Sequence, residues 1–386
     1  MRRNRIIWLV VWILSLIVIS FFGGPISYGF FAVVSLIPVV SIIYLIAVYV
    51  LFHIYQRIET DWPVANQMVP FYFTLVNDYY LIFSGIRIKF YSSFSNISGL
   101  DEETEYELFP GNGITKETSL VCKYRGEYEV GIKTVIIQDF FRLFCFSYHN
   151  REPLRVVVKP KLVHLNNLIN ENINMAVRET RVNASEPDVL VRKYILGDDI
   201  RQVHWNVSAK SGELMVRSKI GEEQQGIGIL LSTHRCGKNQ FEYLPTENKM
   251  LEATLALVLY FVKAGMPVLH FHTASSLESR RISNLAQFDE YYNFVSNVVF
   301  DDNKKDELLF IEATKNRALF ECKVVFMILH ELNEAALQTI QILNENNIYT
   351  VACIVNDSIA KGTIDHNMTR VEIINISPED NLEEVL

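Results

Sequence analysis

Two apolar segments without a charged residue, residues 6–22 and 30–52, stand close together near the start of this sequence of 386 residues. A helix needs roughly 20 apolar residues to cross about 30 Å of membrane hydrocarbon at about 1.5 Å per residue. Only residues 23–29 separate the two segments, so the two helices must run in opposite directions. The sequence therefore predicts a transmembrane hairpin within residues 1–58 that tethers the rest of the chain to a membrane.

Arginine residues flank this hairpin on both sides. Arg2, Arg3 and Arg5 precede the first segment and Arg57 follows the second, whereas residues 23–29 carry no charge. Lys and Arg are enriched on the cytoplasmic side of membrane helices, which predicts a cytoplasmic N-terminus and cytoplasmic soluble domains. A cleaved signal peptide is the alternative, but its apolar core normally has about 7–15 residues and ends at a small-residue cleavage site. Residues 20–23 offer no good site, so we expect a two-span protein of the cell membrane.

Charge and cysteine content exclude several classes of function. The formal net charge is −8, so a nucleic-acid partner, which needs a basic surface, is not expected. The five cysteines are scattered without a C-x-x-C pair, which argues against a disulfide framework or a zinc ribbon and is typical of a reduced, cytosolic domain. The sequence lacks a Walker motif, a G-x-G-x-x-G after a strand and an H-E-x-x-H, so no motif indicates a cofactor or a catalytic metal.

Two soluble domains are predicted from the change in apolar periodicity along the chain. Residues 70–162 contain short alternating segments with turn signals between them, which predicts a small β-sandwich. Residues 224–376 alternate apolar strands with amphipathic helices, which predicts a doubly wound α/β domain. Residues 163–223 connect the two domains, and residues 377–386 are expected to form an acidic, solvated tail.

The connecting segment carries the most distinctive pattern of the soluble part. A turn is expected at residues 197–199, then a short helix that ends at Gly212, then a strand. Here the sequence resembles the bacterial domain-of-unknown-function-58 family, whose hallmark is Arg-x-Tyr, Gly-Asp, Arg, His-Trp, Ser-Ala and Gly-x-Leu. The matching residues are Arg192, Tyr194, Gly197, Asp198, Arg201, His204, Trp205, Ser208, Ala209, Gly212 and Leu214.

A second stretch adds to this resemblance. Arg125-Gly126-Glu127-Tyr128 with Gly131, followed by Asp139, Phe141, Leu143 and Phe144, is similar to the family's Arg-Gly-x-Tyr and Asp-Pro-Phe-Gly-Leu-Phe motifs. Phe140 and Arg142 replace the usual Pro and Gly. The resemblance implies a two-helix anchor, a β-sandwich and a von Willebrand factor type A-like α/β domain. It also implies work beside MoxR-type AAA+ ATPases, often with a membrane-bound transglutaminase-like protein, and no established reaction.

One departure from that pattern concerns metal binding. In von Willebrand type A domains, Asp-x-Ser-x-Ser at the end of the first strand holds a divalent cation. The matching positions here are Ser232, His234 and Cys236. No carboxylate remains for a hard cation such as Mg²⁺, so we expect a degenerate metal-ion-dependent adhesion site that binds no metal in the family manner.

Two sets of residues have the types needed for catalysis. Asp198, His204 and Ser208 lie in one short segment, but no strand–Ser–helix elbow or oxyanion-hole signal accompanies them. The other set is made of histidines that each close a predicted strand, and imidazoles gathered at one sheet edge would suit Zn²⁺. Its members are His234, His272 and His330, with His270 on the same strand face as His272. A structural role is the simpler interpretation of both sets.

The sequence therefore favours a non-enzymatic adaptor, without a cofactor, that binds protein partners at the membrane. The alternative is a membrane-associated hydrolase that uses His204 or a metal site of the strand-end histidines. An enzyme should have a deep pocket lined by these histidines with an acidic partner, whereas an adaptor should have a shallow, exposed surface there.

Overall fold

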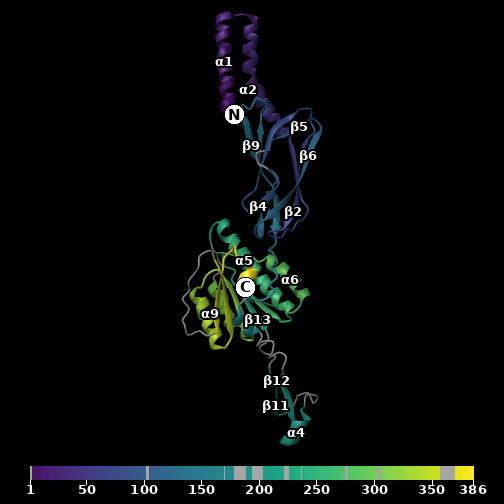
Figure 1. Ribbon diagram of the computed structural model, residues 1–386, viewed down its shortest axis with the longest axis vertical. Coiled ribbons are helices and arrows are strands. Elements are labelled where there is room, and N and C mark those ends of the chain that lie inside the picture. Colours follow the sequence, from purple (N-terminus) through teal and green to yellow (C-terminus); the bar gives the residue numbers. More distant parts are fainter. Residues whose placement is uncertain are drawn as a thin grey trace. The chain divides into compact units, whose positions relative to one another are not determined.

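The computed structural model describes residues 2–100, 104–168, 170–177, 188–193, 203–220, 226–235, 237–273, 277–301, 306–356 and 370–386. Contacts between residues divide the chain into two compact units, Met1–Lys159 and Pro160–Leu386. Figure 1 traces both units.

The first unit begins with the two apolar helices that the sequence predicts. Helix α1 spans Arg2–Phe22 and helix α2 spans Pro25–Leu51, and both are long and apolar enough to cross a membrane. Gly23 turns the chain with a φ of 52°, a conformation that glycine adopts without steric cost, and Pro25 opens α2. The Trp8 Nε1 donates to the Val34 carbonyl and the Trp12 Nε1 to Ser35 Oγ, so the helices pair side by side (Figure 1).

The end of α2 does not lie in the same surroundings as its start. Tyr44, Leu45 and Val48 are buried in one core with the strands that follow, whereas Ile43 and Val50 are exposed. The expected span of residues 30–52 is therefore divided between an exposed apolar helix and a protein core. The sequence alone does not separate the two, because apolar side chains are stabilised in lipid and in a core alike.

Two four-stranded antiparallel sheets form the rest of the first unit. One has the order β1–β2–β6–β4 and the other β5–β3–β8–β9. In chain order the strands are β1 (His53–Ile58), β2 (Met68–Asn77), β3 (Phe83–Phe90), β4 (Ser95–Ser98), β5 (Tyr106–Leu108), β6 (Asn112–Cys122), β8 (Ile132–Gln138) and β9 (Cys145–His149), with a separate pair of β7 (Gly126–Val130) and β10 (Leu154–Val158).

Alternation of side chains builds the core between these sheets. Every second residue of β2 is buried, including Phe71 and Phe73, and these meet Phe83 and Ile86 of β3 in one cluster. Strand β1 pairs with β2 from His53 onward, so the sheets begin at residue 53. The sequence predicts a hairpin over residues 1–58 and a sandwich from residue 70, and both boundaries are therefore corrected. The reason is that β1 is half exposed and gives only a weak strand signal in the sequence.

The second unit is built on a six-stranded sheet of order β15–β14–β13–β16–β17–β18. The strands are β13 (Gly226–Leu231), β14 (Val268–Thr273), β15 (Leu277–Ile282), β16 (Cys322–Leu329), β17 (Tyr349–Val355) and β18 (Val371–Ile376). All neighbours are parallel except β14 and β15. Strands β13, β16 and β17 are buried almost throughout, as strands covered on both faces must be.

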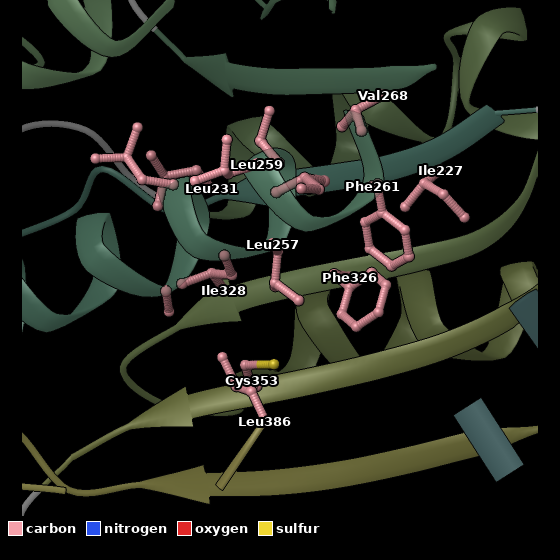
Figure 2. Packing of buried hydrophobic residues seen from close by; sticks show 14 of the residues in the cluster. Ile227, Leu231, Leu257, Leu259, Phe261, Val268, Phe326, Ile328, Cys353 and Leu386 are labelled. Carbon is pink, nitrogen blue, oxygen red and sulfur yellow. The ribbon is translucent and has the colours of Figure 1, made fainter. Parts of the chain in front are cut away.

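Helices cover both faces of this sheet, which agrees with the predicted doubly wound α/β arrangement. Helices α5 (Gln240–Lys263), α6 (Leu285–Ser296) and α10 (Leu382–Val385) contribute to the core on one face. Helices α7 (Asp306–Ala313), α8 (Arg317–Phe320) and α9 (Glu334–Glu345) contribute to the other. Figure 2 shows Leu257 and Phe261 of α5 against Phe326 and Ile328 of β16.

The C-terminal residues join the first of these two cores. Leu382 and Leu386 are each only 1% exposed, and Leu386 lies near Cys353 (Figure 2). Residues 377–386 are therefore more than the solvated acidic tail that their composition predicts. Leucines spaced among acidic residues form one apolar side of a short helix, and that side is buried.

Candidate functional site

The carboxyl ends of β13, β14 and β16 meet at one edge of the α/β sheet, where ligands bind in sheets of this class. Backbone and hydroxyl groups bind the strand ends together. Ser232 N donates to the Ile328 carbonyl at 2.9 Å, and Thr233 Oγ1 donates to the Thr273 carbonyl at 3.2 Å. Ser232 is fully buried, so its hydroxyl is not presented to solvent.

A charge pair lies directly beyond β13. Arg235 Nε is 2.7 Å from Glu247 Oε1, and the Glu247 carboxylate is buried within α5. The Arg235 guanidinium also stacks over the Tyr243 ring at 4.1 Å from its centroid. The cation and the carboxylate neutralise one another, so this edge presents a fixed, internally paired structure. Neither residue was singled out from the sequence, although Arg235 lies between His234 and Cys236, two of the positions at which a degenerate metal site was expected.

The strand-end histidines form two pairs and not one group of three. His234 and His330 have ring centroids 5.7 Å apart, and His270 stacks on His272 at 5.4 Å. His272 packs against Phe294 of α6, 5.0 Å away, and its Nε2 is 3.5 Å from Glu278 Oε2. Side chains on alternate positions of β14 share one face, so His272 follows His270 toward α6. In the described parts of the chain, no group of three His, Cys, Asp or Glu side chains is placed to hold a metal.

His270 lies deepest of these histidines, with no exposed surface. Burial, with smaller contributions from the charges of His272 and Arg280, lowers the pKa of His270 well below its ordinary value. Its ring lies 5.2 Å from that of Tyr291, whose pKa is raised by burial. Both rings are therefore neutral at physiological pH and act as part of the core.

The segment with the hallmark residues forms a small hairpin with a helix. Strand β11 (Asp188–Lys193) pairs antiparallel with β12 (Met215–Ile220), and Arg192 lies opposite Val216. Helix α4 spans Trp205–Ser211, and Gly212 ends it in the left-handed conformation with a φ of 68°, as predicted. The Ser208 hydroxyl donates to the His204 carbonyl at 3.0 Å and accepts from Met215 N at 2.8 Å.

These contacts bear on the hypothesis that Asp198, His204 and Ser208 act together in catalysis. The Ser208 hydroxyl is engaged with backbone groups that join α4 to β12, which is a structural use. Tyr194, Gly197, Asp198, Arg201 and Cys236 lie outside the described residues. Trp205 is 63% exposed and Leu214 50% exposed, and Ala209 is exposed as well.

Residues 190–267 match the family described as "Protein of unknown function DUF58". The chain therefore carries a DUF58 match over part of its length. The match begins within the hallmark segment and extends through β12, β13 and α5 to the residue before β14. It includes Arg235 and Glu247 of the candidate edge, but not the carboxyl ends of β14 and β16.

Other comparisons with known proteins add little to this. Proximal thread matrix protein 1 from the mussel byssus is similar with 10% identity and a TM-score of 0.27, over 34% of this chain and 38% of that one. A GH20 exo-β-N-acetylglucosaminidase from Vibrio harveyi has 8% identity and a TM-score of 0.17, over 79% of this chain and 57% of that one. The chain thus spans less than two thirds of either structure, and scores this low say nothing about its activity. No curated protein matches it.

The second part of the upstream motif, residues 139–144, shapes the loop between β8 and β9. Asp139 Oδ1 accepts from Phe144 N at 2.7 Å, and Arg142 N donates to the Asp139 carbonyl. Arg142, which stands where the family motif usually has glycine, has a φ of 54°. The glycine of the motif is thus explained by a left-handed turn, which this chain forms with an arginine.

Proposed function

We propose that this DUF58 protein is a membrane-anchored adaptor without enzymatic activity. The hairpin of α1 and α2 crosses the cell membrane twice, and both soluble units are cytoplasmic. The protein binds protein partners through the carboxyl edge of the α/β sheet, and it needs no cofactor. The expected partners are a MoxR-type AAA+ ATPase and a transglutaminase-like membrane protein.

The observation that carries this proposal is the closed character of the edge. His272 and His330 are 5% and 3% exposed, and Arg235 is paired with Glu247, so these side chains are withdrawn from solvent or paired within the chain. Phe241 in the first turn of α5, two residues before the Tyr243 that Arg235 contacts, is 66% exposed. A rigid surface with an exposed aromatic ring is typical of a docking site, whereas a catalytic site needs reactive groups open to a substrate.

The strand order supports a von Willebrand factor type A-like assignment of the α/β unit. Counted along the chain from β13, the order is 3-2-1-4-5-6 with an antiparallel third strand. The proposed degenerate metal positions then fall at Ser232, His234 and Cys236, immediately after the first strand. Mg²⁺ prefers carboxylate and water oxygens, so partner binding is expected to be independent of Mg²⁺.

Co-purification tests the proposal. The full-length, tagged chain is solubilised in detergent, and retention of the MoxR-type ATPase is measured with Mg²⁺ or with EDTA. We expect retention in both, and a strong loss in Phe241→Asp. Leu285→Asp is the matched control, because Leu285 is 53% exposed near the start of α6, at the opposite edge of the sheet. Equal retention by Phe241→Asp and wild type would refute the docking edge.

Calorimetric titration of the same detergent-solubilised chain separates the adaptor from a metal-dependent protein. Mg²⁺ should give no heat of specific binding, and Zn²⁺ serves as the comparison because imidazoles prefer it. Stoichiometric Zn²⁺ binding that is lost in His234→Ala would instead favour the hydrolase alternative.

A further inference from the structure

One end of the two-sheet core in the first unit carries a group of exposed aromatic side chains. Tyr79 and Tyr80 lie between β2 and β3, Phe109 follows β5, and Phe140 and Phe141 follow β8. Tyr80 is 99% exposed, and Phe109, Phe140 and Phe141 are each more than half exposed. Exposed rings gathered in this way indicate an interaction surface, because scattered single residues are the rule on soluble proteins.

Hydrogen bonds and ring contacts place these loops together. Asn77 Nδ2 donates to the carbonyls of Leu81 and Leu108, so the β2–β3 loop lies beside the end of β5. Tyr44 of α2 donates through its hydroxyl to the Ile82 carbonyl and packs its ring 4.7 Å from that of Phe140. The aromatic end is therefore the end at which α2 enters the unit.

The loop after β8 is also attached to the start of α1. Asn4 Nδ2 donates to the Phe141 carbonyl, and Arg5 Nε donates to the Leu143 carbonyl. Arg2 and Arg3 are exposed on the same helical turn, and Arg142 is 57% exposed in the loop itself. The rings thus lie level with a cluster of cations, which is the arrangement of side chains at a membrane–water interface.

An apolar groove of about 330 Å³ lies between α2 and this loop, lined among others by Val40, Ile43, Ala47, Leu81, Phe140 and Phe141. It continues the exposed apolar surface of α2, on which Val33, Leu36 and Val40 are each more than half exposed. A partner for this end must therefore offer apolar chains beside anionic groups. Phospholipids combine both in one molecule.

We infer that the end of the first unit formed by Tyr79, Tyr80, Phe109, Phe140 and Phe141 is a membrane-contact surface that sinks into the lipid headgroup layer. This inference rests on the proposed membrane insertion of the hairpin. The aromatic rings occupy the interface, the groove holds part of an acyl chain, and Arg2 and Arg3 meet lipid phosphates. The unit is thereby held against the membrane, in addition to being tethered to it.

Site-directed fluorescence in vesicles tests the inference. The full chain, with Cys145→Ser and Cys236→Ser, is labelled with an NBD fluorophore at single introduced cysteines, since Cys122, Cys322 and Cys353 are buried. It is reconstituted into phosphatidylcholine–phosphatidylglycerol vesicles with nitroxide-labelled lipids. Phe141→Cys reports on the aromatic end. Met68→Cys is the matched control, because Met68 is 72% exposed at the opposite end of β2.

We expect several-fold stronger quenching by shallow nitroxides at position 141 than at position 68. A label at Val33→Cys, in the middle of α2, should be quenched by deep nitroxides and reports on hairpin insertion separately. Quenching at 33 but equal, weak quenching at 141 and 68 would overturn this inference and leave the anchor intact. If position 141 is weakly quenched in vesicles but is shielded from solvent in native membranes, a protein and not lipid covers this end, and the inference is wrong. Absence of quenching at 33 would overturn both the anchor and the inference.

Discussion

At the scale of single residues, Arg142 shows how a family motif records a backbone requirement. Its φ of 54° lies in the left-handed region, which costs an L-amino acid roughly 1–2 kcal/mol relative to ordinary backbone. The arginine compensates in part through an exposed ion pair, with Arg142 Nη2 at 2.9 Å from Glu105 Oε2. Such pairs contribute about 0–1 kcal/mol, so the ion pair offsets only part of the strain.

Two substitutions separate these effects. Arg142→Gly and Arg142→Ala both remove the ion pair, but only glycine relieves the left-handed strain. We expect Arg142→Gly to be more stable than Arg142→Ala by about 1 kcal/mol. The free energy of unfolding of the first unit is measured by urea denaturation of the full chain in detergent, with limited proteolysis of that unit as the readout. Equal stability of the two variants would show that the turn is not strained.

His270 predicts a pH dependence of the α/β unit. Its pKa is lowered in the folded state, so the unfolded chain binds the proton more readily once the pH falls below about 6.5, the value of an unperturbed histidine. The stability contributed by neutral His270 is therefore complete above that pH and is lost as the pH falls toward the lowered folded pKa. The loss should approach about 1.4 kcal/mol per pH unit.

Urea denaturation of the full chain at several pH values between 5 and 8 measures this slope. Limited proteolysis of the second unit is the readout. In His270→Phe, which keeps an aromatic ring beside Tyr291, the slope should become shallower by that amount. His164→Asn is the control, because His164 is exposed in the same unit, and its slope should match the wild type. An unchanged slope in His270→Phe would contradict the assignment.

At the scale of elements, α2 serves two purposes in one continuous helix. Its start is exposed and apolar, whereas near its end Tyr44, Leu45 and Val48 are buried against β-strands. The Tyr44 hydroxyl also accepts from the buried Ser84 N at 2.9 Å, at an irregularity of β3. The helix is therefore fixed to the sheets by packing and by hydrogen bonds.

Two valines on α2 test this junction. Val48 is fully buried and Val50 is 65% exposed. Val48→Ala should destabilise the first unit by about 2 kcal/mol, through lost burial and the cavity left behind. Val50→Ala, the same change two residues away, should cost less than about 0.5 kcal/mol, as is usual for exposed sites. Similar costs for both variants, measured by urea denaturation of the first unit, would mean that α2 ends in lipid and not in the core.

At the scale of the whole molecule, the arginine flanks of the hairpin predict that both ends of the chain are cytoplasmic. Reporter fusions at residue 60 and at the C-terminus measure this directly. Both should be active as cytoplasmic reporters and inactive as export-dependent ones. Moving the positive charge, by Arg2→Glu, Arg3→Glu and Arg5→Glu with two lysines inserted at residues 23–29, should produce a mixed or inverted topology. If either reporter fused to the wild-type chain is active outside the cytoplasm, the proposed cytoplasmic location of that end is wrong.

Local patterns in the sequence were sufficient for the long helices, most buried strands and the family resemblance, but not for short helices such as α10, which lies in the predicted acidic tail. Long apolar runs, the alternation in β2 and the helix-ending Gly212 each depend on a few neighbouring residues, and local chemistry determines them. The eleven hallmark residues likewise pointed to DUF58 before any geometry was known. Strand β15 was missed because its sequence, Leu-Glu-Ser-Arg-Arg-Ile, is mostly exposed at the sheet edge and lacks a buried pattern.

The tertiary structure alone decided which of these elements share an environment. It divided the apolar run of α2 between an exposed surface and a core, paired His234 with His330 and His270 with His272, and left Trp205 exposed. It also joined Arg235 to Glu247 and brought Phe109, Phe140 and Tyr80 to one end of the unit. Such contacts link residues distant in the chain, and their energies depend on packing partners that no local window of sequence contains.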